Sequence, residues 1–275
     1  MKSLKTIALL LTLVLALAAC GDDGGTTDDT GTTGTDGSDG ATTELETITP
    51  GTLTVCTDAP YPPMEYEDPD TGEFTGFDIE LLRAVAGNLG LDLAVVNVGF
   101  DPITSGLAME AGDCDIAAAS ITITPERAEN IAFTDGYFSA DQSLLVLADS
   151  GIETLEDLSG QSIAVQTGTT GAEYAEENAP EDAEIVSFEN PGDVFLALES
   201  GQVQGVLQDI VPNQDYANSN ESAVVVETYE TDEEYGFAAA LEGTEDLIAA
   251  VNEQLEALRS DGTYDEIYQQ FFPEN

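Results

Sequence analysis

Residues 115–138 read DIAAASITITPERAENIAFTDGYF, and this stretch decides how the rest of the chain is organised. It opens as an apolar strand, and three hydroxyl side chains then precede Arg127, those of Ser120, Thr122 and Thr124. A strand that ends in hydroxyls beside an arginine offers hydrogen-bond donors to an anion. Arginine suits a carboxylate in particular, because its planar fork donates two parallel hydrogen bonds.

The shortage of basic residues draws attention to Arg127. Beyond residue 20 the chain has 55 acidic residues and three basic ones, Arg83, Arg127 and Arg259. In such a chain, an arginine beside hydroxyls at a strand end is a candidate anion-binding residue. The alternative is a surface arginine paired with Glu126 or Glu129.

The first 20 residues have the form of a bacterial lipoprotein signal. Lys2 and Lys5 precede an apolar core that is too short to span a bilayer. The signal ends in Leu-Ala-Ala-Cys, which resembles a lipobox, so we expect Cys20 to carry a lipid. The alternative is an ordinary signal peptide with an incidental cysteine.

Residues 21–46 consist largely of Gly, Thr, Asp and Ser, a composition that cannot form a core. We expect a disordered acidic linker there. The remaining residues have a mixed α/β pattern and are numerous enough for one large or two small domains. These features predict an extracytoplasmic protein that is lipid-anchored to the outer face of the cell membrane.

The chain has a formal net charge of −50. Removal of the signal takes away two lysines and no acid, so the mature balance is 3 − 55 = −52. A charge of this sign and size argues against nucleic acids and anionic lipids as partners. The near absence of lysine predicts an acidic surface of halophilic type, which needs salt to screen its self-repulsion.

Two cysteines, Cys56 and Cys114, fall in the folded part, where an exported chain could pair them. We expect them to be unpaired. Cys56 lies near the end of its predicted strand and Cys114 at the start of another, so parallel strands would separate them by about 13 Å. A disulfide needs Cα atoms within about 7 Å. The chain has no histidine and no thiol cluster, so we expect neither a metal site nor a cofactor.

Predicted strands and helices alternate along the folded part, which argues for mainly parallel sheets. Strands are expected at residues 53–57, 91–98, 115–120, 162–165, 185–188, 205–208 and 235–241. Helices are expected from Asp78, as N-cap, to residue 89, and at residues 103–111, 172–178, 194–199, 245–258 and 264–272.

One internal echo divides the chain into two similar parts. Residues 107–120 (LAMEAGDCDIAAAS) and 196–209 (LALESGQVQGVLQD) match in length and pattern, each reading as a helix, a glycine stop and a strand. Their last residues, Ser120 and Asp209, fall at equivalent places at the carboxyl end of a strand. Ligands bind there in open α/β sheets.

Six motifs in order over residues 52–272 resemble those of the extracytoplasmic solute-binding proteins of polar amino acid ABC transporters. They are GxLxVxTDxxYPP, GFDIELL, GxxDxxxxxxTxTxER-x5-F-x3-Y, QTGTT, LQD and LRSDGTYDEIY. The resemblance implies an α/β, two-lobed periplasmic-binding-protein fold of type II, with two mainly parallel sheets flanked by helices. Lobe 1 would comprise residues 47–146 and 235–275, and lobe 2 residues 147–234. Two crossovers near residues 144–149 and 231–237 would form a hinge.

The resemblance also implies a site for a free amino acid between the lobes. Arg127 matches the arginine that grips the α-carboxylate, helped by Thr122 and by Thr170 at a helix N-terminus. Asp209 matches the carboxylate that pairs with the α-ammonium, and Ser120 supplies a further polar contact. Since Arg127 and Asp209 belong to different lobes, one zwitterion can bridge them and hold them closed.

Three further matches concern the ligand's side chain. Tyr61 and Phe100 match aromatics that sandwich it, although the segment after Phe100 is longer than in the family. Asp58 matches a position that reads its tip and disfavours an acidic ligand. Because Arg83 and Arg259 lie on predicted helices, an acidic side chain has no partner, and a basic or amide side chain is favoured. The alternative is that Asp58 only caps its turn.

The implied partners are the transmembrane permease subunits of an ABC transporter, and a monomer is the default expectation. Two other classes of function remain open. One is an enzyme on the same fold that resembles cyclohexadienyl or arogenate dehydratase, although the chain lacks histidine and shows no catalytic carboxylate pair by spacing. The other is a ligand-sensing domain that signals through a separate receptor.

Overall fold

The structure is a computed structural model that describes residues 45–273, which belong to one compact unit. The predicted signal, Cys20 and nearly all of the predicted linker lie outside the described residues. Within residues 45–273, no helix combines the length and the apolar character that a membrane span requires.

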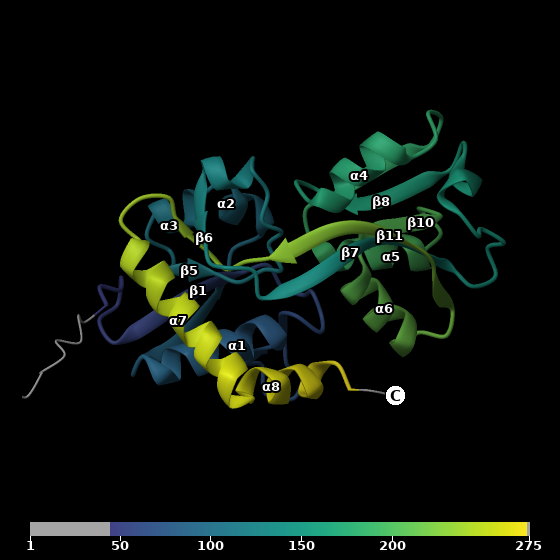
Figure 1. Ribbon diagram of the computed structural model, residues 1–275. Helices are drawn as coiled ribbons and strands as arrows, with labels where there is room; N and C mark the ends of the chain where they lie inside the picture. Colours follow the sequence, from purple (N-terminus) through teal and green to yellow (C-terminus); the bar gives the residue numbers. More distant parts are fainter. Residues whose placement is uncertain (1–44, 274–275) are drawn as a thin grey trace, which may run out of the picture. The chain divides into compact units, whose positions relative to one another are not determined.

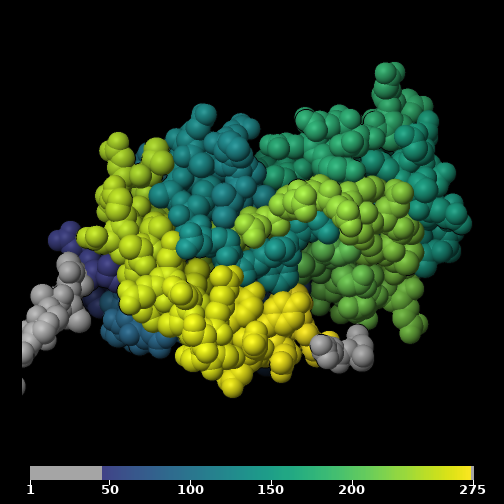
Figure 2. Space-filling model, in the orientation of Figure 1, coloured from purple at the N-terminus to yellow at the C-terminus, as the bar shows by residue number. Residues whose placement is uncertain are grey.

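The first sheet brings together strands from distant parts of the chain (Figure 1). Its order is β4 (Asp92–Asn97), β1 (Thr52–Thr57), β5 (Ile116–Ala117), β12 (Ala238–Ala240) and β6 (Ile131–Phe133). This sheet and its helices form lobe 1; the helices are α1 (Phe77–Asn88), α2 (Phe100–Thr104), α3 (Leu107–Glu110), α7 (Glu245–Asp261) and α8 (Thr263–Phe271). A small hairpin, β2 (Tyr66–Glu67) and β3 (Phe74–Thr75), follows β1. In the space-filling view, the C-terminal helices, in yellow, cover one side of lobe 1 (Figure 2), where α7 and α8 contact α1.

The second sheet defines lobe 2. Its order is β11 (Ala223–Tyr235), β7 (Phe138–Leu147), β10 (Gly205–Asp209), β8 (Ser162–Gln166) and β9 (Glu184–Phe188). Its helices are α4 (Thr170–Asn178), α5 (Pro191–Glu199), α6 (Ile210–Ser219) and the short η2 (Leu155–Leu158).

The predicted two-lobed α/β fold is confirmed, and the sheets differ from the prediction in one respect. In lobe 1, β1 pairs in parallel with β4 and β5, whereas β12 is antiparallel to both of its neighbours. In lobe 2, β8 pairs in parallel with β9 and β10, whereas β7 is antiparallel to β10 and β11. Both sheets are therefore mixed, because each contains a strand that the chain supplies after crossing from the other lobe.

The first crossover lies earlier than predicted. Residues 144–149 were expected to join the lobes, but residues 144–147 lie in the middle of lobe 2, in β7 between β10 and β11. The apolar run there is that of a central strand, buried on both faces. By sheet membership, lobe 2 therefore begins at Phe138. The second crossover agrees with its predicted place, since β11 ends at Tyr235 and β12 begins at Ala238.

Cys56 and Cys114 form a disulfide with Cα atoms 5.5 Å apart, so the prediction that they are unpaired is wrong. That prediction assumed an extended chain from residue 114 onward. Strand β5 starts only at Ile116, and Asp115 lies in a bend. The Asp115 carboxylate fixes the bend by accepting the backbone N–H of Thr54 on β1 at 2.8 Å. The bend brings Cys114 back to Cys56.

Helix α1 buries the expected apolar stripe, but its N-cap differs from the prediction. Ile79, Leu82 and Val85 are fully buried. The N-cap is Gly76, and Asp78 lies inside the first turn. The Asp78 carboxylate points away from the helix end and accepts a hydrogen bond from lobe 1 backbone near the cleft.

The two matched segments, residues 107–120 and 196–209, share the order of a helix, a turn and a strand, although the strands differ in length. Asp115 and Gln204 occupy equivalent positions in them. The side chain of each accepts the backbone N–H of a residue in β1 or β8, Thr54 at 2.8 Å and Ser162 at 3.0 Å. The backbone N–H of each donates to the carbonyl of the same residue, at 2.9 and 2.8 Å. The predicted similarity of the two segments is therefore confirmed, because equivalent residues form equivalent hydrogen bonds.

Candidate functional site

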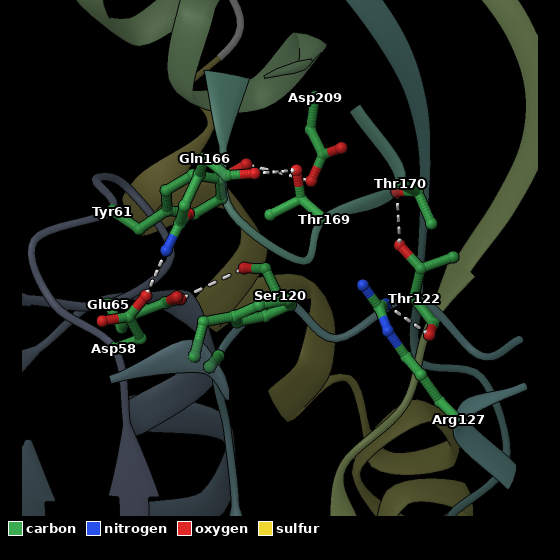
Figure 3. A pocket seen from close by; sticks show the side chains of 12 residues that line it. Asp58, Tyr61, Glu65, Ser120, Thr122, Arg127, Gln166, Thr169, Thr170 and Asp209 are labelled. Carbon is green, nitrogen blue, oxygen red and sulfur yellow. Dashed lines mark hydrogen bonds between the residues drawn. The ribbon is translucent and has the colours of Figure 1, made fainter. Parts of the chain in front are cut away.

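One pocket between the lobes collects all eight residues that were predicted to contact a ligand (Figure 3). The predicted lining residues are Asp58, Tyr61, Phe100, Ser120, Thr122, Arg127, Thr170 and Asp209. The lining residues that were not predicted are Glu65, Ala119, Gln166 and Thr169. The structure thus brings the eight residues together, while their binding of a ligand stays a prediction.

The pocket is small because polar groups of the two lobes bond to each other across it. Its volume is about 20 Å³, which is roughly the space for one water molecule. The Tyr61 hydroxyl donates to the Asp209 carboxylate at 3.0 Å, and the Gln166 amide donates to the Asp58 carboxylate at 2.6 Å. A molecule the size of an amino acid can enter only when these contacts separate.

Arg127 lies on the short 3₁₀ helix η1 (Arg127–Glu129) and is 8% exposed. Its Nη1 donates to the Thr122 carbonyl at 2.8 Å, and its Nη2 donates to the Gly168 carbonyl of lobe 2 at 3.1 Å. Its guanidinium lies over the Phe100 ring, with Cζ 5.1 Å from the ring centroid. These contacts hold the guanidinium in place and leave part of its fork free to donate.

No carboxylate within residues 45–273 comes within 4.0 Å of the Arg127 guanidinium. The alternative of a surface arginine paired with Glu126 or Glu129 therefore does not hold. Burial lowers the pKa of Arg127, and the nearby Asp209 carboxylate opposes that shift. A buried arginine without a carboxylate partner is a ready site for an anion from outside the chain.

Asp209 ends β10 and is the N-cap residue of α6. Its carboxylate accepts hydrogen bonds from the hydroxyls of Tyr61 (3.0 Å) and Tyr235 (2.5 Å) and from the Gln142 amide (2.5 Å). Burial raises the pKa of Asp209 to about 6, the nearby Glu233 carboxylate adds to the shift, and the three hydrogen bonds oppose it. Asp209 is thus a buried acid that a cation would stabilise in its charged form.

Asp58 follows β1 and meets lobe 2 through Gln166 at the end of β8. Its carboxylate bonds across the cleft rather than to the turn that follows it. Burial raises the pKa of Asp58 to about 6, the Gln166 hydrogen bond opposes the shift, and the Glu189 charge adds to it. The hydrogen bond between Gln166 and Asp58 therefore links the two lobes at one side of the pocket.

Glu65 is a second buried acid of lobe 1, 1% exposed. It accepts the Ser120 hydroxyl at 3.1 Å, while Asp78 accepts the Ser120 backbone N–H at 2.9 Å. These bonds hold Ser120 at a φ of 48°, in the left-handed region that is uncommon outside glycine. Burial, reinforced by the Asp78 charge, raises the pKa of Glu65 well above its ordinary value.

Thr122 of lobe 1 and Thr170 of lobe 2 meet where the lobes face each other near Arg127. The preceding residue, Thr169, is the N-cap of α4, and its hydroxyl accepts the Ala172 backbone N–H at 3.1 Å. Thr170 is the first residue of that helix, and its Oγ1 lies 3.5 Å from Oγ1 of Thr122 in lobe 1. Thr122 and Thr170 therefore face each other from the two lobes.

The charges that line the pocket are unbalanced. The acids are Asp58, Glu65 and Asp209, and the base is Arg127. Figure 3 shows Arg127 beside Thr122, and Asp58 and Glu65 on the opposite side of the pocket. Asp209 lies near Thr169 in the same view. Such a lining can hold a molecule with one carboxylate and one or more cationic groups.

Gln166 and Glu65 line the pocket but were not predicted, and only the first of them could have been identified from the sequence. Gln166 ends β8, so the rule that ligands bind at strand carboxyl ends could have found it. Glu65 lies beyond Pro62 and Pro63 in a turn without periodicity, and only the three-dimensional structure brings it to Ser120.

Comparison with known proteins finds relatives over the whole folded part. The profile of the family "Bacterial extracellular solute-binding proteins, family 3" matches residues 53–274. The ABC transporter glutamine-binding protein GlnH of Bacillus subtilis (strain 168) is 33% identical over 280 residues, which cover 100% of this chain and 99% of that protein.

Solved structures give the same result. An ancestral arginine-binding protein bound to glutamine is 36% identical, with a TM-score of 0.75, over 82% of this chain and 99% of that one. The ancestral amino acid-binding protein AncCDT-1, a precursor of cyclohexadienyl dehydratase, is 38% identical, with a TM-score of 0.74, over 81% of this chain and 96% of that one. All three similar proteins are named as binding proteins rather than as enzymes.

Proposed function

Because the chain belongs to the bacterial extracellular solute-binding proteins of family 3, we propose that it captures a free polar amino acid with a basic or amide side chain. Binding between the lobes would close them, and the closed protein would deliver the amino acid to the transmembrane permease of an ABC transporter.

The observation that carries this proposal is the placement of Arg127 and Asp209 on opposite lobes of one pocket. Arg127 is buried, and within the described residues it lacks a carboxylate partner. Asp209 is buried, and its pKa is raised, so it gains from a cationic partner. An α-amino acid carries the two complementary charges at a fixed spacing, so it can bridge the pair.

The opposite end of the pocket supports a basic or amide side chain. Asp58 and Glu65 are acceptors there, and Gln166 can both donate and accept. An acidic side chain would meet two carboxylates. The other two arginines are engaged elsewhere: Arg83 pairs with Glu80 at 3.1 Å, and Arg259 donates to backbone carbonyls of lobe 1.

The aromatics Tyr61 and Phe100 are each 8% exposed and would pack against the aliphatic part of the ligand. Ser120 would add a polar contact beside Glu65. Anchoring through a lipid on Cys20 would keep the protein on the outer face of the membrane, near its permease. A monomer is sufficient for this role, since both halves of the pocket come from one chain.

A thermal-shift screen of the purified protein in molar salt, with the twenty amino acids plus ornithine and citrulline, tests the proposal. Arginine, lysine, ornithine or glutamine should raise the melting temperature, because a ligand that binds only the folded state stabilises it. Arg127→Ala should abolish the shift. A response to aspartate or glutamate alone would contradict the preference of the Asp58 and Glu65 end of the pocket for a basic or amide side chain. No response to any amino acid would refute the proposal.

A further inference from the structure

Glu233 brings a carboxylate from the hinge strand β11 to the two threonines of the pocket. The hydroxyl of Thr122 donates to its Oε2 at 2.8 Å, and the hydroxyl of Thr170 donates to the same atom at 2.7 Å. The Gln142 amide donates to its Oε1 at 3.0 Å. Glu233 itself is half-buried. One carboxylate from the chain therefore sits between hydroxyls of both lobes.

The number of available hydrogens limits what these threonines can do. A hydroxyl has one hydrogen to donate, and in this structure both threonines donate theirs to Glu233. With Glu233 in this position, neither hydroxyl can donate to a second carboxylate. Arg127 differs, because its two hydrogen bonds to backbone carbonyls leave further N–H groups of its fork.

We propose that Glu233 is a built-in competitor of the ligand's carboxylate, and so a residue that lowers the affinity for ligands that carry a carboxylate and narrows their advantage over the corresponding amines. This inference rests on the proposed function. The carboxylate of an incoming amino acid first meets Arg127, and it gains the hydroxyls of Thr122 and Thr170 only by displacing Glu233. Two carboxylates of like charge cannot share these donors without repulsion.

The surroundings of Glu233 permit this displacement. The pairing of β11 with β7 shifts register between Tyr229 and Glu233, so the strand is irregular there. The preceding residue, Asp232, has a φ of 52°, in the left-handed region. Gln142 donates to both Glu233 and Asp209, so it keeps a buried acceptor when Glu233 leaves. The cost of moving Glu233 is therefore confined to its own three contacts.

Loss of Glu233 should affect ligands with and without a carboxylate differently. An amino acid gains from the loss of Glu233, because its carboxylate then has the two hydroxyls without competition or repulsion. The corresponding amine without a carboxylate has nothing to place there, and removal of a nearby negative charge weakens the binding of a cation. The same substitution should thus tighten the binding of the amino acid and should not tighten the binding of the amine.

Calorimetric titration of the whole protein with L-arginine and agmatine, and with L-glutamine and 4-aminobutanamide, tests this sign. Glu233→Ala should lower the Kd of the amino acid by about tenfold, the scale of one hydrogen bond to a charged group. The Kd of the decarboxylated partner should stay unchanged or rise. Glu234→Ala is the matched control, because it removes the same charge from an exposed neighbouring position and should change neither Kd.

Glu233→Gln keeps the size and the acceptor oxygen, and it should give a smaller tightening of the same sign if the alanine variant folds poorly. Equal changes for both members of a pair, or weaker amino acid binding in both variants, would overturn the inference while leaving the proposed function intact. Absence of binding by wild type and both variants would instead refute the proposed function, and the inference with it.

Discussion

Residues 107–120 and residues 196–209 follow one pattern, but they hold their last residue at the cleft by different means. In lobe 2 the segment ends in β10, whose five residues pair with β7 on one side and, in part, with β8 on the other. In lobe 1 it ends in β5, which has two residues, and Ser120 lies beyond the strand. The sheet positions Asp209, whereas the carboxylates of Asp78 and Glu65 hold Ser120, and a disulfide at Cys114 fixes an earlier point of the same segment.

The clearest difference lies at the equivalent positions 114 and 203. Cys114 is bonded to Cys56 on β1. Val203 is 1% exposed and belongs to the apolar core of lobe 2. A repeated sequence pattern thus gives the same path of the chain in both lobes, while the contacts that secure this path differ between them.

Breaking the covalent tether should have the largest effect. Replacement of both Cys56 and Cys114 by alanine should lower the free energy of unfolding by about 4 kcal/mol, because the disulfide closes a loop with a sequence separation of 58. Guanidinium unfolding in fixed salt measures the loss.

Val203→Ala is the matched change in lobe 2, and it should cost about 1–3 kcal/mol, the scale of removing buried methyl groups. If the cysteine variant loses less than Val203→Ala, the tether is not what secures lobe 1. Treatment of the wild type with a reductant should reproduce the loss. Val203→Ala, measured without the reductant and with its disulfide intact, is the comparison.

The next largest effect is expected on ligand binding, where Ser120 and Asp209, the last residues of the two segments, should differ. Asp209→Asn removes a buried charge that faces the ligand's ammonium, and it should raise the Kd about 100-fold. Ser120→Ala removes one neutral hydrogen bond, and it should raise the Kd less than about tenfold. Calorimetry with the amino acid found in the screen measures both, and equal losses would contradict the distinct roles of the two positions.

Buried acids of both lobes should make stability depend on pH. Asp58 in lobe 1 and Asp209 in lobe 2 each have a pKa raised to about 6 from 3.8, chiefly by burial. A carboxyl whose pKa rises on folding binds its proton more tightly in the folded state. Its contribution to stability is therefore full below pH 3.8 and is lost as the pH rises through about 6.

Ligand binding should show the opposite trend. A cationic group beside Asp209 favours the charged carboxylate, so affinity should fall as the pH drops below 6, by about tenfold between pH 7 and pH 5. Titrations across this range measure it, and Asp209→Asn should flatten the profile more than Asp58→Asn does for an amide ligand. A pH-independent Kd in the wild type would contradict the role of both acids.

The smallest effect is expected at the exposed start of the two segments. Leu107 and Leu196 occupy equivalent positions and are 59% and 60% exposed. Replacement of either by serine should change the free energy of unfolding by less than about 0.5 kcal/mol. Thermal unfolding of both variants checks this, and a large loss in only one of them would mean that the lobes differ at their surfaces as well.

The sequence pattern was sufficient for the repeat, the two lobes and the positions of Arg127 and Asp209. These features depend on local periodicity and on residues at strand ends, which a single sequence displays. The pairing of Cys56 with Cys114 was not predictable in this way, because it depends on a bend that the Asp115 side chain fixes through a contact with a distant strand.

Glu65 and Glu233 escaped prediction for a related reason. Neither follows a strand end or a helical stripe, and both reach the site through contacts with segments far away in sequence, 55 residues from Ser120 for Glu65 and 63 residues from Thr170 for Glu233. In a chain with 55 acids, nothing local marks these two as buried or half-buried.

The passage between the lobes has a mechanical consequence. Strand β7 begins and β11 ends side by side, with Phe138 paired to Tyr235 and Ser139 to Glu234 (Figure 1). Two chain passes that are hydrogen-bonded to each other form one ribbon, which resists sliding along its length and flexes across its plane. The lobes are therefore joined by a two-stranded ribbon, and we expect them to open by bending of this ribbon across its plane. The register shift between Tyr229 and Glu233 interrupts the pairing of the two strands, so we expect the ribbon to bend most easily there.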